Sequence, residues 1–120
     1  MHELVGERVL MRIHLSENDK YEGKSLSETI VALLRERRFA GGTVFRGAMS
    51  FGTNSTLHTD RIEVMSLDLP LVVECVETED NIRAILPDLD RMIGGGLITL
   101  ERANVVLYRS GSDEEASNEA

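Results

Sequence analysis

The chain has 120 residues, 42% of them hydrophobic and 28% charged, and carries a formal net charge of −8 at pH 7. This length is typical of one domain and the composition of a globular protein. No apolar run approaches the roughly 20 residues that cross a bilayer, and the N-terminus lacks a signal segment. The single cysteine, Cys75, excludes an intrachain disulfide. We therefore expect a cytoplasmic protein that is not inserted in a membrane.

Negative charge gathers at the C-terminus. The acidic residues there are Asp113, Glu114, Glu115 and Glu119, and no basic residue accompanies them. Small polar residues with one sign of charge favour a disordered acidic tail. The sequence thus predicts a folded domain over residues 1–110 and a tail over 111–120. The domain has no basic stripe, so we expect no nucleic-acid partner.

Residues 7–15 are predicted to form the first strand, because apolar side chains recur at every second position. The alternate positions of this strand include Arg12 and His14, which share its other face. A polar loop is expected over residues 16–24. A helix is then predicted to begin at the cap Ser25, with Glu28 completing a capping box, and to end at the glycine pair 41–42.

The second half predicts the same alternation of strand and helix. Residues 43–51 and 71–76 favour strands, with a short extended arm over 61–67 between them. A second helix is predicted from the cap Thr78 to Ile93, and Pro87 inside it should kink or divide it. Two extended segments follow the triple glycine 94–96, at residues 97–100 and 104–108.

This order predicts an α+β ferredoxin-like βαββαβ sandwich, with an antiparallel sheet and both helices on one face. The opposite face of the sheet has no helix to cover it. It should therefore be polar or meet other subunits, and the residues that make such association plausible are Met11, Phe45, Phe51 and Val73.

Several short motifs occur in an order that resembles the PII-like signalling proteins, within a branch of uncharacterised PII-like domains. The motifs span about residues 7–111. They are Gly41-Gly42-Thr43-Val44, Phe51-Gly52, the run from Arg91 to Ile98 around the triple glycine, and Arg109-Ser110-Gly111. The resemblance implies a homotrimer with sheets facing its centre, and an adenine-nucleotide pocket between neighbouring subunits.

Carried over to this chain, the resemblance assigns the pocket to Gly52, the glycines Gly94, Gly95 and Gly96, and Arg109. Arg46 and Arg102 join them as candidates, since a guanidinium can bind phosphate through two hydrogen bonds. Two positions where PII proteins carry cations hold Leu97 and Leu107 here. A nucleoside monophosphate, a diphosphate or a cyclic nucleotide therefore fits better than a triphosphate.

The leading hypothesis is thus a regulatory protein whose loop 52–60 responds to a bound effector and engages a partner. In this branch the resemblance implies a membrane transport protein or ion channel as that partner. One alternative is a structural or interaction module whose nucleotide site has decayed. Another is a small metal-binding protein that uses His14. We expect no enzyme, because the titratable residues form no catalytic triad or zinc-ligand spacing.

Overall fold

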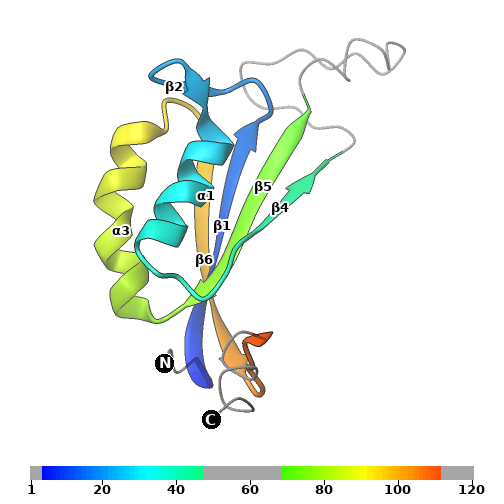
Figure 1. The fold of residues 1–120 in the computed structure, drawn as a ribbon, viewed down its shortest axis with the longest axis vertical. Helices are drawn as coiled ribbons and strands as arrows, with labels where there is room; N and C mark the ends of the chain where they lie inside the picture. The colour runs from blue at the N-terminus through cyan, green and yellow to red at the C-terminus, as the bar shows by residue number, and fades with distance from the viewer. Residues whose placement is uncertain (1–3, 48–68, 112–120) are drawn as a thin grey trace.

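The computed structural model of the chain describes residues 4–47 and 69–111. In chain order its elements are β1 (Gly6–Ser16), β2 (Lys20–Tyr21), β3 (Lys24–Ser25), α1 (Leu26–Glu36), β4 (Thr43–Arg46), β5 (Pro70–Glu77), α3 (Glu79–Met92) and β6 (Leu97–Val105). The main sheet has the strand order β4-β5-β1-β6, and every pair is antiparallel. Both helices lie on one face of it (Figure 1). The predicted ferredoxin-like α+β fold is therefore confirmed.

Both helices begin at the predicted caps. The hydroxyl oxygen of Ser25 accepts a hydrogen bond from the Glu28 N–H at 3.3 Å. The hydroxyl oxygen of Thr78 accepts one from the Asn81 N–H, also at 3.3 Å. Each bond satisfies a backbone donor that the first helical turn leaves without a partner.

Three local predictions need correction. The first helix ends at Glu36, before the predicted glycine pair 41–42. The expected loop over 16–24 contains the β2–β3 hairpin, whose two-residue turn places Glu22 and Gly23 at φ 49° and 82°. Positive φ at both turn residues matches the twist of paired strands. The two expected segments after the triple glycine are one strand, β6, which ends before Leu107 and Arg109. The arm at 61–67, Phe51, Gly52 and the tail from 112 onward lie outside the described residues.

Pro87 does not divide the second helix, since α3 runs without interruption from Glu79 to Met92. Proline removes one backbone donor and costs helix stability. Here the buried side chains of Ile82 and Ile85 before it, and of Leu89 and Met92 after it, lie on the same helical face. Packing of both halves against the core holds the turns in register around the proline.

The core lies between the helices and the sheet. Its strand residues come from alternate positions of β1 and β5, and its helix residues from the apolar stripes of α1 and α3. Met11 and Val73 belong to it and are at most 1% exposed. The expectation that these two residues support association through the uncovered face is therefore wrong, because both point toward the helices.

One charged side chain is fully buried at the edge of this core. The Glu77 carboxylate accepts hydrogen bonds at 3.0 Å from the N–H groups of Ala40 and Thr78 and from the side-chain amide of Asn81. These partners come from the segment after α1 and from the start of α3. Glu77 thus ties the ends of both helices to strand β5.

Candidate functional site

The sheet face without helices, here called the open face, carries a group of polar and apolar side chains that no helix covers. Its side chains follow from the strand register, because residues opposite each other in an antiparallel pair point to the same side. They are Leu10, Arg12 and His14 of β1, Thr43 and Phe45 of β4, Val72, Glu74 and Val76 of β5, and Leu97, Thr99 and Glu101 of β6. The prediction that Arg12 and His14 share one face is confirmed.

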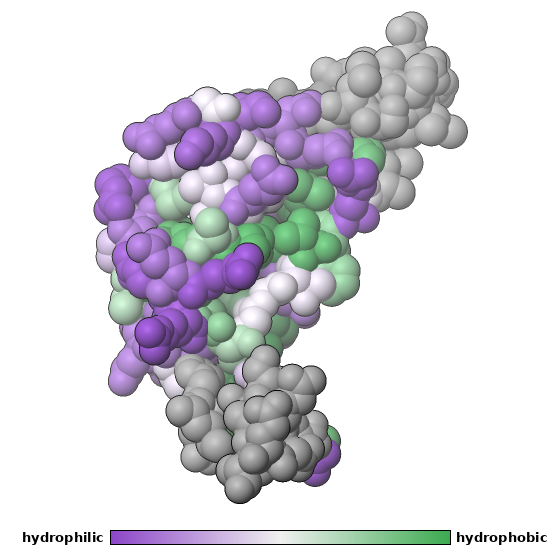
Figure 2. Space-filling model, in the orientation of Figure 1, coloured by the Kyte–Doolittle hydropathy of each residue, from purple (hydrophilic) through white to green (hydrophobic). Residues whose placement is uncertain are grey.

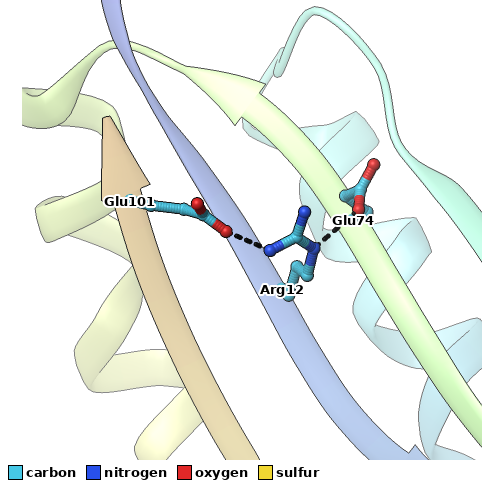
Figure 3. Close-up of polar contacts among 3 residues, drawn as sticks. All are labelled: Arg12, Glu74 and Glu101. Atoms are coloured by element: carbon cyan, nitrogen blue, oxygen red, sulfur yellow. Dashed lines mark hydrogen bonds and ion pairs between the residues drawn. The ribbon is translucent and has the colours of Figure 1, made fainter. Parts of the chain in front are cut away.

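Arg12 lies at the middle of the open face between two carboxylates (Figure 3). Its Nε donates to Glu74 Oε2 at 2.9 Å, and one of its terminal nitrogens pairs with Glu101. The hydrogen bonds to Glu74 and then to Glu101 raise the pKa of Arg12 above its usual value. Two carboxylates against one guanidinium leave this triad with an excess negative charge.

A row of three apolar side chains and His14 crosses the sheet beside the triad. Phe45 is opposite Val72, Val72 is opposite His14, and His14 is opposite Leu97. Phe45 and Leu97 are 50% and 57% exposed. Large apolar side chains gathered on an uncovered sheet face are typical of an interaction surface.

The triple glycine connects α3 to β6 and borders a cavity of about 270 Å³. Gly96 is required by the fold: its φ is 153°, and a Cβ there would approach the backbone oxygen of His14 to 2.6 Å. Gly94 and Gly95 differ, since a Cβ at either would meet no atom within 4 Å and neither has positive φ. Neither packing nor backbone conformation within the described chain requires glycine at these two positions.

The structure does not bring the predicted site residues together within one chain. Arg46 lies on β4 and the glycines precede β6, so they occupy opposite edges of the sheet. Arg102 lies toward the far end of β6 from the glycines, and its guanidinium is 3.4 Å from Glu7. Arg109 is exposed beyond the end of β6. Gly52 is outside the described residues, so its part in the site stays a prediction.

Sequence reasoning missed the partners of Arg12. Glu74 gave a partial signal, because it interrupts an otherwise apolar strand, but Glu101 gave none. Both contacts depend on the pairing of β5 and β6 with β1, at sequence separations of 62 and 89 residues. Within residues 4–47 and 69–111, no three His, Cys, Asp or Glu side chains form a group that could hold a metal ion.

Besides Glu77, the core contains one more titratable residue among those described, Cys75. Its thiol is buried on the helix side of β5, and this burial, followed by the charges of Glu77 and Glu74, raises its pKa to about 12. A thiol with so high a pKa is a poor nucleophile at neutral pH.

Neither helix of the described chain has the length and hydrophobicity to cross a membrane.

Comparison with known proteins assigns this chain to a family. The model of the DUF190 family, described as uncharacterised ACR, matches residues 8–105. A UPF0166 protein of Methanocaldococcus jannaschii is 34% identical over 97 residues, which cover 80% of this chain and 89% of the relative. Two UPF0166 proteins of Aquifex aeolicus are each 31% identical, over 102 and 99 residues, and cover 85% and 82% of this chain. The chain therefore belongs to the uncharacterised DUF190 family, in keeping with the resemblance to the uncharacterised PII-like branch.

Proposed function

We propose that this protein is a PII-like regulator that binds an adenine nucleotide at clefts between the subunits of a homotrimer. The observation that carries the proposal is the pair Gly94 and Gly95, which face open space beside a cavity. Glycine without a conformational or packing requirement is suited to close approach of a ligand to the backbone. The proposed ligand is a monophosphate, a diphosphate or a cyclic nucleotide.

The small size of the cavity supports a site completed by a neighbouring subunit. Its volume of about 270 Å³ is below the usual range of roughly 300–1,000 Å³ for ligand pockets. Arg46 lies on the opposite edge of the same sheet. A second copy could bring that edge to the glycines of the first, which would enlarge the cavity and supply a cation for phosphate. The exposed Phe45 and Leu97 on the open face offer apolar area for this assembly.

Regulation would then act through the chain that follows β4. Gly47 and Leu69 border the residues outside the described chain, and Arg46 directly precedes Gly47. A nucleotide held by Arg46 would bias the conformation of the adjoining loop, and the loop would engage or release a partner. The proposed partner is a membrane transport protein or an ion channel.

Thermal melting with AMP, ADP, ATP and cyclic AMP tests the proposal. A nucleotide at a hundred times its dissociation constant should stabilise each site by about 2.7 kcal/mol, a shift of several degrees for a domain of this size. Gly95→Val should abolish the shift. Gly41→Val, at another glycine with open space around it, should leave it unchanged. No shift with any of the four nucleotides would refute nucleotide binding.

A second candidate is an interaction module without a ligand. It is favoured by Leu97 and Leu107, which are 57% and 61% exposed where PII proteins carry phosphate-binding cations. In that case the chain would assemble through its open face while no nucleotide changed its melting temperature. Melting and sedimentation together separate the two candidates.

A further inference from the structure

The main sheet has two free edges. β4 forms one border and β6 the other, and each pairs with a single strand among residues 4–47 and 69–111. Three antiparallel steps separate them, so β4 and β6 run in opposite directions. A free edge favours pairing with a further strand, and a head-to-tail contact between copies generates a ring when the rotation closes. The two edges are therefore complementary halves of a head-to-tail contact.

The backbone groups on the free edge of β4 follow from its pairing with β5. The N–H of Gly47 donates to the oxygen of Pro70 at 2.7 Å, so these two residues form a hydrogen-bonded pair. Such pairs alternate with non-hydrogen-bonded pairs along an antiparallel ladder. The backbone groups that point away from β5 are therefore those of Val44 and Arg46.

The free edge of β6 follows in the same way. The N–H of Glu17 donates to the oxygen of Leu69 at 2.7 Å, which assigns the odd-numbered residues of β1 to the ladder with β5. The even-numbered residues, His14 among them, then bond to β6, and His14 is opposite Leu97. The outward backbone groups at the start of β6 are therefore those of Ile98 and of the preceding residue, Gly96.

We infer that β4 of one copy pairs antiparallel with the start of β6 of the next, with Phe45 opposite Leu97. Val44 then exchanges backbone hydrogen bonds with Ile98, and Arg46 with Gly96. The inference rests on the proposed homotrimer and names the contact between its subunits. The outward groups of both edges meet in this register, and each sheet keeps its open face on the same side.

The row across the open face selects this register. Phe45 and Leu97 lie at its two ends, on opposite edges of the sheet, and they are 50% and 57% exposed. Placing them opposite each other continues the row from one copy to the next, as a direct cross-strand pair of an aromatic and an aliphatic side chain. A shift by two residues would place Phe45 opposite Thr99 and leave Leu97 without an apolar neighbour across the contact.

The register also brings Arg46 to the glycine cavity of the next copy. Gly96 borders that cavity of about 270 Å³ and has no side chain to separate it from Arg46. On the helix side of β4, Val44 and Arg46 line a groove of about 630 Å³ against α1. Figure 2 shows hydrophobic surface between α1 and β4, with hydrophilic side chains on both sides of it. The pairing thus joins the groove of one copy to the cavity of the next.

Charge is compatible with this contact. Among residues 43–46 and 96–99 only Arg46 is charged, and the charged residue that lines the cavity of the next copy is Asp90, of opposite sign. The other charged residues near Arg46 on its own copy are Glu17, its ion-pair partner at 2.5 Å, and the groove residues Glu28 and Arg35. A phosphate at the glycines would therefore bind Arg46 in competition with carboxylates.

Cysteine cross-linking of the full-length protein with the oxidant diamide tests the pairing. Thr43 and Thr99 are opposite in this register, with Cα atoms about 4.5 Å apart, within the roughly 4.4–6.8 Å that a disulfide spans. Within one chain three strand spacings, or about 14 Å, separate them, so an intrachain disulfide cannot form. Thr43→Cys with Thr99→Cys should therefore yield covalent dimers and trimers on a non-reducing gel.

Thr43→Cys with Leu97→Cys provides the matched control. These positions are diagonal neighbours in the register, roughly 7–8 Å apart, so cross-linking should be at least about fivefold slower. Phe45→Cys with Leu97→Cys is in register and should cross-link rapidly, although it removes two side chains of the row. The parent chain, whose Cys75 is buried, should not cross-link.

The outcomes separate this contact from the proposed function. A protein that sediments as a trimer but forms no disulfide in either in-register variant would overturn the strand pairing and leave the homotrimer unaffected. Equal rates for in-register and diagonal pairs would overturn the register. Cross-linking requires no nucleotide. Rapid in-register cross-linking in a protein whose melting temperature no nucleotide changes would support the pairing and refute nucleotide binding.

Discussion

The two faces of the sheet are built from alternating residues of the same strands, and they differ in packing and in charge. The covered face holds Met11, Ile13 and Val73, each at most 1% exposed, beneath α1 and α3. The open face holds the Arg12 triad and the partly exposed row that contains Phe45 and Leu97. Among residues 4–47 and 69–111 the covered face has its apolar partners in the helices, whereas no helix covers the open face.

The covered face therefore accounts mainly for the stability of the fold, and the open face is where we expect function. Burial of the covered face against the helices supplies most of the hydrophobic stabilisation of the fold. The open face and the sheet edges contain features that contacts within the described part of the chain do not explain: exposed apolar side chains, an excess carboxylate and glycines without a structural requirement. Substitutions on the two faces should therefore affect different measurements.

The largest expected effect is at Glu77, on the covered side of β5. Glu77→Ala leaves three N–H donors without their acceptor, so we expect a loss of about 3–5 kcal/mol in the free energy of unfolding. Glu74→Ala, three residues earlier on the open side, should cost a small fraction of that. Urea unfolding of both variants measures the contrast, and similar losses would contradict it.

Met11 and Leu10 provide the same contrast with apolar side chains. Met11→Ala creates a cavity beneath the helices and should cost about 3 kcal/mol. Leu10→Ala removes a partly buried side chain of the open face and should cost less than about 1 kcal/mol in dilute protein. Its cost should grow with protein concentration if copies associate through this face. Equal costs at every concentration would remove the distinction between the faces.

The same contrast applies within the triple glycine, because the fold requires Gly96 whereas only the proposed ligand site requires Gly95. Gly96→Ala forces a Cβ to 2.6 Å from the His14 oxygen, and we expect a loss of about 2 kcal/mol in thermal or urea unfolding. Gly95→Ala meets open space and should leave stability unchanged or raise it slightly, by up to about 1 kcal/mol. A destabilised Gly95 variant would mean that the fold, and no ligand, requires this glycine.

The smallest expected effect on stability is at Asp88 of α3, whose carboxylate pairs with Arg37 at the end of α1 and with Arg91 of α3. Hydrogen bonds from Arg91 and Arg37 lower the pKa of this carboxyl below its usual value. Because the folded-state pKa is below the unfolded one, the contribution is present above the unfolded pKa and is lost as pH falls through the folded value. Asp88→Asn should reduce the acid dependence of unfolding below about pH 4. Parallel stability profiles of variant and parent below that pH would contradict this assignment.

Local patterns predicted most of the fold. The alternation in residues 7–15 identified the buried face of β1, and the caps Ser25 and Thr78 located both helix starts, because these signals act between near neighbours. The undivided helix around Pro87 could not be predicted, since its cause is tertiary packing. The Arg12 triad depends on strand register across distant segments. Arg46 was grouped with the triple glycine because its guanidinium could bind phosphate, but only the strand order reveals that they lie on opposite edges.

The sedimentation velocity of the full-length protein tests the central claim most directly, namely that the open face is an interface between copies of this chain. Each chain has a mass of 13.3 kDa. The account predicts a species of about three times that mass at micromolar concentration, dissociated by Phe45→Lys, which places a cation in the row of apolar side chains. A monomer at every accessible concentration would contradict the account.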